Sequence, residues 1–172
     1  MNDEIILVNE KDEPVGYGSK EDIHRTGDLH RAFSVFLYNG RKLLIQQRAD
    51  HKYHSPGLWA NTCCSHPRKG EKTDDAVKRR LMEEAGIECE AHEIFSFLYK
   101  CQFNENLYEH EYDHVYLGKY DGTYEINPDE VKAFRWIDIS ELQIDIENHP
   151  EKYAYWFKLA VPKVIKIIEE KG

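Results

Sequence analysis

Residues 65–87 read SHPRKGEKTDDAVKRRLMEEAGI, and the interpretation of the whole chain starts from this stretch. Its second half predicts a helix that Thr73 or Asp74 caps and that runs to about Ala85, where Gly86 supplies a stop signal. An apolar stripe on this helix would face a core, and it consists of Ala76, Val77, Leu81 and Ala85.

Strand patterns lie on both sides of this helix. Before it, Asn39-Gly40 is a strong signal for a tight turn between two strands, His30–Tyr38 and Lys42–Gln47. Further strands are expected at Glu4–Val8, Pro14–Gly18, Ile94–Gln102, His110–Tyr120 and Val131–Ile137. Residues 53–68 should form an ordered loop around a short strand. Short helices are expected at Lys20–His24, Ser140–Gln143, Glu151–Trp156 and Val161–Glu169. These elements predict an α/β (α+β) fold, a mixed-sheet sandwich with flanking helices, in one domain over residues 1–172.

Composition narrows the class of function. A formal net charge of -9 argues against a non-specific nucleic-acid binder, because contacts to many phosphates need a basic face. A small phosphorylated ligand needs only a local basic pocket. No apolar run approaches a membrane span, and Ile5–Val8 is too short for a secretory signal. The four cysteines show no disulfide spacing, so we expect reduced thiols in a soluble cytoplasmic protein.

The stretch 65–87 follows the pattern S-x5-E-x7-R-R-L-x-E-E-x-G-I. This pattern resembles the Nudix box, G-x5-E-x7-R-E-U-x-E-E-x-G-U, where U is an aliphatic residue. The matching positions are Glu71, Arg79, Leu81, Glu83, Glu84, Gly86 and Ile87. In Nudix enzymes this loop–helix–loop holds divalent metal against a diphosphate, because carboxylate oxygens suit Mg²⁺. The resemblance therefore implies a Nudix-type fold and a diphosphate substrate.

Two positions depart from the box. Ser65 replaces its first glycine, and Arg80 stands where the hydrolases carry a metal-binding glutamate. Arg80 and Glu84 are four residues apart on the predicted helix, a spacing that is also typical of a plain surface ion pair. Within the box match we favour Arg80 as a diphosphate contact and Glu84 as a Mg²⁺ ligand, which puts pyrophosphate hydrolysis in doubt.

A second resemblance is more specific. The segment W-A-N-T-C-C-S-H-P at 59–67 resembles the cysteine signature of type 1 isopentenyl diphosphate isomerases, which use a modified Nudix fold. Y-E-H-E-Y at 108–112 resembles the E-x-E motif of the same family. The likeness also covers residues 30–39, 43–48 and 156–158, and thus nearly the whole chain. It implies an enzyme that interconverts isopentenyl and dimethylallyl diphosphate through a tertiary carbocation.

The resemblance also implies catalytic residues. Shifting an unactivated double bond needs an acid on one face of the substrate and a base on the other. These tasks fall to Cys64, the cysteine two residues before His66, and to Glu111. Tyr99 would support the carboxylate, and Trp156 would present its π face to the carbocation. Without the resemblance both aromatic residues would be interpreted as core.

A metal site is implied as well. Its residues match His24, His30, His66, Glu109 and Glu111. The two glutamates share one face of a strand, since side chains alternate along a strand with a period of two. A mixed nitrogen and oxygen set is compatible with Mn²⁺, Mg²⁺ or Zn²⁺. A separate Mg²⁺ is expected to arrive with the substrate diphosphate and to bind Glu84. Taken singly, each histidine would be a structural or surface residue and each glutamate part of a solvated face.

Diphosphate contacts are implied at Lys20, Arg48, Lys52 and Arg80. Together these cations would give the local positive pocket that an allylic or homoallylic diphosphate needs. The leading alternative is a Nudix hydrolase of an organic diphosphate, against which Arg80 and the pair Cys64 and His66 argue. A third possibility is a catalytically silent diphosphate-binding module, which the presence of Cys64 and Glu111 disfavours.

Overall fold

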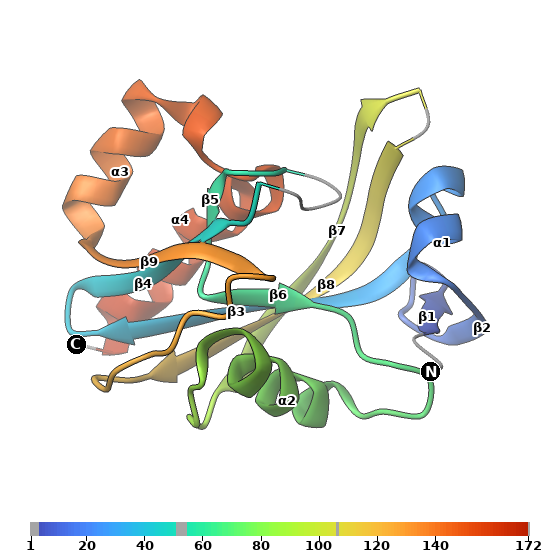
Figure 1. Cartoon of the computed structure of the whole chain (residues 1–172), viewed down its shortest axis with the longest axis horizontal. Helices are drawn as coiled ribbons and strands as arrows, with labels where there is room; N and C mark the ends of the chain where they lie inside the picture. Colours follow the sequence, from blue (N-terminus) through green and yellow to red (C-terminus); the bar gives the residue numbers. More distant parts are fainter. Residues whose placement is uncertain (1–3, 51–54, 106, 172) are drawn as a thin grey trace.

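The computed structural model describes residues 4–50, 55–105 and 107–171, where one mixed sheet lies between helices (Figure 1). Its strands are β1 (Ile5–Val8), β2 (Pro14–Gly18), β3 (His30–Asn39), β4 (Lys42–Arg48), β5 (Trp59–Ala60), β6 (Cys63–Ser65), β7 (His92–Asn104), β8 (Leu107–Lys119) and β9 (Val131–Asp138). The helices are α1 (Lys20–Thr26), α2 (Thr73–Ala85), α3 (Ile139–Asn148) and α4 (Tyr155–Lys171), with a 3-10 turn η1 at Pro150–Lys152. The predicted α+β architecture is confirmed. Within the described ranges, none of the helices combines the length and the apolar character needed to cross a membrane.

Strand β3 is the centre of the sheet. One edge pairs in parallel with β8 over residues 30–38. The other edge pairs in turn with β1, β6 and β4, all antiparallel. Because β3 has neighbours on both edges and cover on both faces, six of its consecutive residues, 32–37, are buried. Side chains from four separate strands are therefore placed beside β3.

Two hydrophobic cores cover the two faces of the sheet. On one face Phe33, Val35 and Leu37 pack with the apolar stripe of α2. On the other face Phe36 packs with α3 and α4, and the rings of Phe36 and Phe157 are stacked at 5.8 Å. Figure 1 shows α2 on one side of the sheet and α4 on the other. The odd-numbered residues 33–37 of β3 therefore point toward α2, whereas Phe36 points toward α4, and this alternation gives the layered arrangement.

The end of α2 is as predicted and its beginning is not. Gly86 adopts the left-handed conformation, with φ 62°, and its N–H bonds back to the last turn of the helix. The N-cap is Lys72, without a capping side-chain bond, so the predicted cap at Thr73 or Asp74 was wrong. Asp74 instead accepts a hydrogen bond from the Tyr116 hydroxyl at 2.6 Å, which ties the helix to the sheet.

Two other regions differ from the sequence-based prediction. The loop at 53–68 contains two short strands, β5 and β6, because Trp59–Ala60 pairs with β4 and Cys63–Ser65 pairs with β3. The helix predicted at Glu151–Trp156 is divided. Its first part is η1, the chain is extended at Tyr153, where the Ala154 N–H bonds to Trp59 O at 2.9 Å, and Trp156 belongs to α4. Helix α4 also absorbs the segment predicted at Val161–Glu169, even though it contains Pro162.

The packing of α2 can be tested with two adjacent residues. Leu81 is fully buried against the sheet, whereas the Met82 residue beside it is 51% exposed. Leu81→Ala should lower the free energy of unfolding by about 2–5 kcal/mol, because it leaves a cavity. Met82→Ala should change it by less than about 0.5 kcal/mol. Equilibrium urea unfolding measures both, and equal losses would contradict this packing.

Candidate active site

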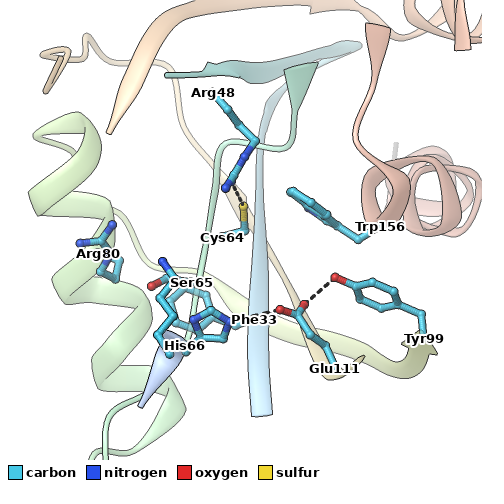
Figure 2. A pocket seen from close by; sticks show the side chains of 10 residues that line it. Phe33, Arg48, Cys64, Ser65, His66, Arg80, Tyr99, Glu111 and Trp156 are labelled. Atoms are coloured by element: carbon cyan, nitrogen blue, oxygen red, sulfur yellow. Dashed lines mark hydrogen bonds and ion pairs between the residues drawn. The ribbon is translucent and has the colours of Figure 1, made fainter. Parts of the chain in front are cut away.

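A pocket opens where strands β3, β6, β7 and β8 meet helices α1, α2 and α4. Its lining residues are Lys20, Phe33, Arg48, Cys64, Ser65, His66, Arg80, Tyr99, Glu111 and Trp156. Figure 2 shows Cys64 and Glu111 in this pocket, with Tyr99 and Trp156 to one side and His66 and Arg80 to the other. Of the predicted catalytic and diphosphate-contacting residues, all but Lys52 lie here. Lys52 falls outside the described residues.

The strand register brings these side chains to one face of the sheet. Ser34 on β3 is the partner of Cys64 on β6, and His30 on β3 is the partner of Glu111 on β8. Glu111 in turn faces Tyr99 on β7. Cross-strand partners project to the same face, so a thiol, an imidazole, a carboxylate and a phenol from four strands lie on one face of the sheet.

The two adjacent cysteines lie in different environments. Cys63 is fully buried and packs in the core that α2 covers. Cys64 packs beside the other core and lines the pocket, where its Sγ accepts a hydrogen bond from Arg48 Nη1 at 3.5 Å. Burial, reinforced by the charges of Glu84 and Glu111, raises the pKa of the Cys64 thiol to about 12 despite Arg48. At neutral pH Cys64 therefore carries a proton.

Glu111 is held by a phenol. The Tyr99 hydroxyl donates to Glu111 Oε1 at 2.7 Å. Burial, together with the negative charge of Glu111, raises the pKa of Tyr99 well above its usual value, so this hydroxyl keeps its proton and remains a donor. The bond fixes one oxygen of the carboxylate at the edge of the pocket (Figure 2).

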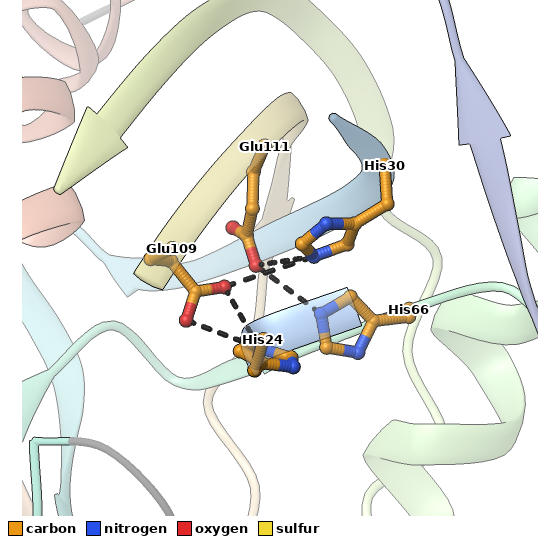
Figure 3. A group of neighbouring side chains, drawn as sticks. All are labelled: His24, His30, His66, Glu109 and Glu111. Atoms are coloured by element: carbon orange, nitrogen blue, oxygen red, sulfur yellow. Dashed lines mark hydrogen bonds and ion pairs between the residues drawn. The ribbon is translucent and has the colours of Figure 1, made fainter. Parts of the chain in front are cut away.

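Beside the pocket, three imidazoles and two carboxylates point toward one another (Figure 3). His24, His30, His66, Glu109 and Glu111 each offer one ligand atom, and these atoms lie within 4.8 Å of one another. His24 Nε2 is 3.2 Å from Glu109 Oε2, and His66 Nε2 is 3.2 Å from Glu111 Oε2. The predicted set is thus assembled from α1, β3, β8 and the residue that follows β6.

Backbone carbonyls orient two of the imidazoles. His24 Nδ1 lies 2.6 Å from Lys20 O, and His30 Nδ1 lies 3.0 Å from Asp28 O. A carbonyl only accepts, so each Nδ1 carries a hydrogen, and each Nε2 is the ring nitrogen turned toward the cluster. The buried His30 Nε2 makes no hydrogen bond with the described residues. A backbone carbonyl that accepts a hydrogen bond from the other ring nitrogen is typical of metal-binding histidines.

The electrostatics of the cluster fit a cation. Burial and the charge of Glu111 raise the pKa of Glu109 to about 8. Burial lowers the pKa of His66 to about 3, so this imidazole is neutral at physiological pH. The neutral imidazole of His66 and two buried carboxyl groups thus belong to a donor set that a bound cation would stabilise. These five residues could hold a divalent metal ion.

Arg80 and Glu84 form an ion pair on α2, 2.7 Å between Nη2 and Oε2. Their side chains are only 15% and 4% exposed, so the alternative of a plain surface pair is excluded. Arg80 also contacts Glu83 at 2.8 Å and Glu130 at 3.1 Å. Glu84 accepts a further bond from Gln46 Nε2 at 3.0 Å. Arg80 thus presents a cation to the pocket while three carboxylates fix its position.

Sequence reasoning did not identify several residues of this region. Phe33 and Ser65 line the pocket, although Ser65 was noted only as a departure from the box. Asn61, Gln46 and Asp113 are buried polar residues around it. For Asp113 a signal existed, since it continues the two-residue spacing of Glu109 and Glu111 along β8. For Asn61 the only hint was its place inside the cysteine signature.

Known proteins resemble this chain in sequence and in fold. The NUDIX domain family model matches residues 28–159. The chain is 47% identical to Isopentenyl-diphosphate Delta-isomerase 2 of Aromatoleum aromaticum, over 96% of this chain and 88% of that protein. It is 46% identical to a protein of the same name from Photorhabdus laumondii, over 92% of this chain and 90% of that one. The fold is shared with DR0079 of Deinococcus radiodurans, with a TM-score of 0.75, 22% identity, and coverage of 96% of this chain and 98% of that one.

Metal binding can be tested without an activity assay. The protein purified without added chelator should contain a divalent metal by elemental analysis, and His66→Ala should contain little, because the mutation removes one donor from the cluster. His92→Ala is the matched control, since His92 is exposed at the start of β7. Equal metal content in the native protein and in His66→Ala would place the metal elsewhere.

Proposed function

This chain belongs to the NUDIX family and, within it, to the isopentenyl-diphosphate Delta-isomerases, and from that premise we propose how its pocket works. It is an isomerase that interconverts isopentenyl diphosphate and dimethylallyl diphosphate. The observation that carries the mechanism is the presence of a thiol, Cys64, and a carboxylate, Glu111, in one pocket with an aromatic wall. We expect the reaction to take place in the cytoplasm.

Cys64 and Glu111 are the acid/base pair. One of them delivers a proton to the terminal CH₂ of the double bond, which leaves a tertiary carbocation. The other removes a proton from the carbon next to the diphosphate-bearing carbon, and the new double bond forms there. The reverse reaction exchanges their roles, so both groups must face the hydrocarbon.

Two aromatic residues assist this pair. Tyr99 keeps the Glu111 carboxylate oriented through its 2.7 Å bond. Trp156 faces the cation with its indole, an interaction that is strongest where water is excluded. A positive group already lies over this ring, since Arg48 Cζ is 5.2 Å from the ring centroid. Only 3% of Trp156 is exposed, so its face is available only to a molecule inside the pocket.

Cations hold the diphosphate end of the substrate. Lys20, Arg48 and Arg80 converge on the pocket from α1, β4 and α2, and Lys52 is proposed as a fourth contact. Charged hydrogen bonds to phosphate are among the stronger polar contacts in proteins. Because two helices and one strand contribute these cations, the diphosphate would be fixed from several directions and the five-carbon chain directed toward Cys64 and Glu111.

We assign the five-residue cluster to one divalent metal, with Mn²⁺ or Mg²⁺ favoured and Zn²⁺ also compatible. An ion held there would neutralise the buried carboxylates and orient Glu111. Glu84 is proposed as the ligand of a Mg²⁺ that accompanies the diphosphate, since Mg²⁺ is commonly shared between carboxylates and phosphates. Its ion pair with Arg80 implies that Arg80 would shift toward the phosphate oxygens when this Mg²⁺ binds.

The two cysteines provide a sharp test of the acid/base pair. Cys64→Ala should lower the conversion of isopentenyl to dimethylallyl diphosphate by at least about 10²–10⁴-fold, the usual contribution of a positioned proton-transfer group. Cys63→Ala should keep most of the activity, because Cys63 packs in the opposite core. Product formation per folded molecule is the measurement. Comparable activity in Cys64→Ala and wild type would refute the assignment.

Charge reversal at Arg80 separates isomerase from hydrolase. Arg80→Glu restores the residue of the Nudix box, but it also removes a charged contact, typically about 1.5–3 kcal/mol, and adds repulsion. KM for isopentenyl diphosphate should rise at least about tenfold, with no gain of hydrolysis. The control is Lys78→Glu, an equal charge change on the exposed face of the same helix, which should leave KM nearly unchanged.

The assay measures dimethylallyl product and released phosphate in parallel. Wild type should form the product without releasing phosphate. If wild type released phosphate faster than it formed the dimethylallyl product, the isomerase assignment would be wrong, and the protein would be a hydrolase of an organic diphosphate.

A further inference from the structure

Asn61 is a buried polar residue that the mechanism above leaves without a task. It lies in the connection between β5 and β6, and it is 0% exposed. Its Oδ1 accepts a hydrogen bond from Trp156 Nε1 at 3.0 Å. Its Nδ2 donates to Cys63 O at 2.7 Å and to Val35 O at 3.2 Å. Asn61 therefore connects the indole of α4 with the backbone of β3 and β6.

The chemistry of these three partners leaves one orientation for the amide. An indole N–H only donates, so it must meet the amide oxygen, and the two carbonyls only accept, so they must meet the NH₂ group. With both N–H groups engaged, the amide cannot rotate to another partner without leaving buried polar groups unsatisfied. Asn61 is thus a rigid link rather than an adaptable one.

We propose that Asn61 is a positioning residue of the isomerase, which fixes the plane of the Trp156 indole relative to the strand that carries Cys64. Cys63 O belongs to the peptide that immediately precedes Cys64, so one side chain holds both the aromatic wall and the backbone next to the thiol. This inference rests on the proposed function. It adds that the geometry between the acid/base pair and the aromatic face is set by a residue that touches no substrate.

The alternative is that Asn61 serves only stability, like other buried polar residues. Its neighbour Thr62 provides the comparison. Thr62 is also 0% exposed, and its Oγ1 donates to Leu44 O at 2.6 Å and accepts from Leu37 N at 2.9 Å. These bonds reach β3 and β4 and do not involve Trp156. Thr62→Val is therefore a control that loses buried hydrogen bonds near Cys64 without disturbing the indole.

The first measurement detects the contact directly. The chain has three tryptophans, so its ¹⁵N–¹H spectrum should contain three indole signals, and Trp156→Phe identifies the one from Trp156. Asn61→Ala should shift this signal and speed its hydrogen exchange, whereas Thr62→Val should leave it in place. An unchanged Trp156 signal in Asn61→Ala would overturn the inference.

The second measurement is kinetic. Asn61→Ala should lower kcat by about tenfold to a hundredfold, because a misplacement of about 1 Å can cost on the order of 10²-fold. KM should change much less, since Asn61 does not line the pocket that receives the diphosphate. In the Trp156→Phe background, where no indole N–H remains, the same Asn61→Ala change should lower kcat clearly less. Equal losses of kcat in both backgrounds would overturn the inference.

The outcomes separate this inference from the function beneath it. A wild-type protein that forms no dimethylallyl product would overturn both. An active wild type with normal kcat in Asn61→Ala would overturn the inference alone. If Asn61→Ala does not fold, Trp156→Phe decides, because it removes the indole N–H, keeps an aromatic ring at this position and leaves Asn61 on both carbonyls. Unchanged kcat in Trp156→Phe would then overturn the proposal.

Discussion

The register of β3 against its neighbours is the constraint on which the site depends. The parallel pairing with β8 sets His30 opposite Glu111, and the antiparallel pairing with β6 sets Ser34 opposite Cys64. A shift of one residue in either pairing would turn the thiol or the carboxylate to the other face of the sheet. The alternating burial of β3 in two separate cores resists such a shift, since Phe36 and Val35 cannot exchange sides without emptying both. Packing far from the pocket therefore fixes the relative positions of the proposed acid and base.

The buried carboxyl groups next to these paired strands create a second requirement, which is compensating positive charge. Glu109, Glu111 and Asp113 follow one another on the same face of β8, and burial raises the pKa of Glu109 and Asp113. Three imidazoles surround the first two, and two of these are oriented by backbone carbonyls. The Ser34 hydroxyl donates to Asp113 at 2.8 Å. The surroundings thus supply hydrogen bonds to the carboxylates but little positive charge, which is why a metal ion fits the cluster and why the cluster would be costly without one.

Much of this arrangement could be predicted from the sequence, and the limits have a physical cause. The strands, the end of α2 and the pairing of Glu109 with Glu111 follow from local periodicity, which one sequence contains. The roles of Cys64, Tyr99 and Trp156 came from family resemblance, since their residue types alone favour the core. Asn61 and Gln46 were not predicted, because their partners Trp156 and Glu84 lie 95 and 38 residues away. The loop at 53–68 was expected to hold one short strand and holds two, because strands of two or three residues carry no period. The first half of α4 was not predicted, because the packing that holds this helix together across Pro162 leaves no local pattern in the sequence.

The exchange at Arg80 shows how one fold changes its chemistry. In a Nudix hydrolase the box carboxylates gather metal so that water can attack phosphorus, whereas a tertiary carbocation would be destroyed by the same water. Here the box position holds a cation that engages Glu83, Glu84 and Glu130, so the helix offers positive charge to the pocket. The carboxylates proposed for proton transfer and for the tightly held metal lie instead on β8, next to Tyr99 and near Trp156. Glu84 stays on the helix for the Mg²⁺ proposed to accompany the diphosphate, whereas the carboxylates on the sheet lie beside aromatic side chains that exclude water. This rearrangement, more than any single residue, distinguishes a site suited to proton transfer on carbon from one suited to hydrolysis.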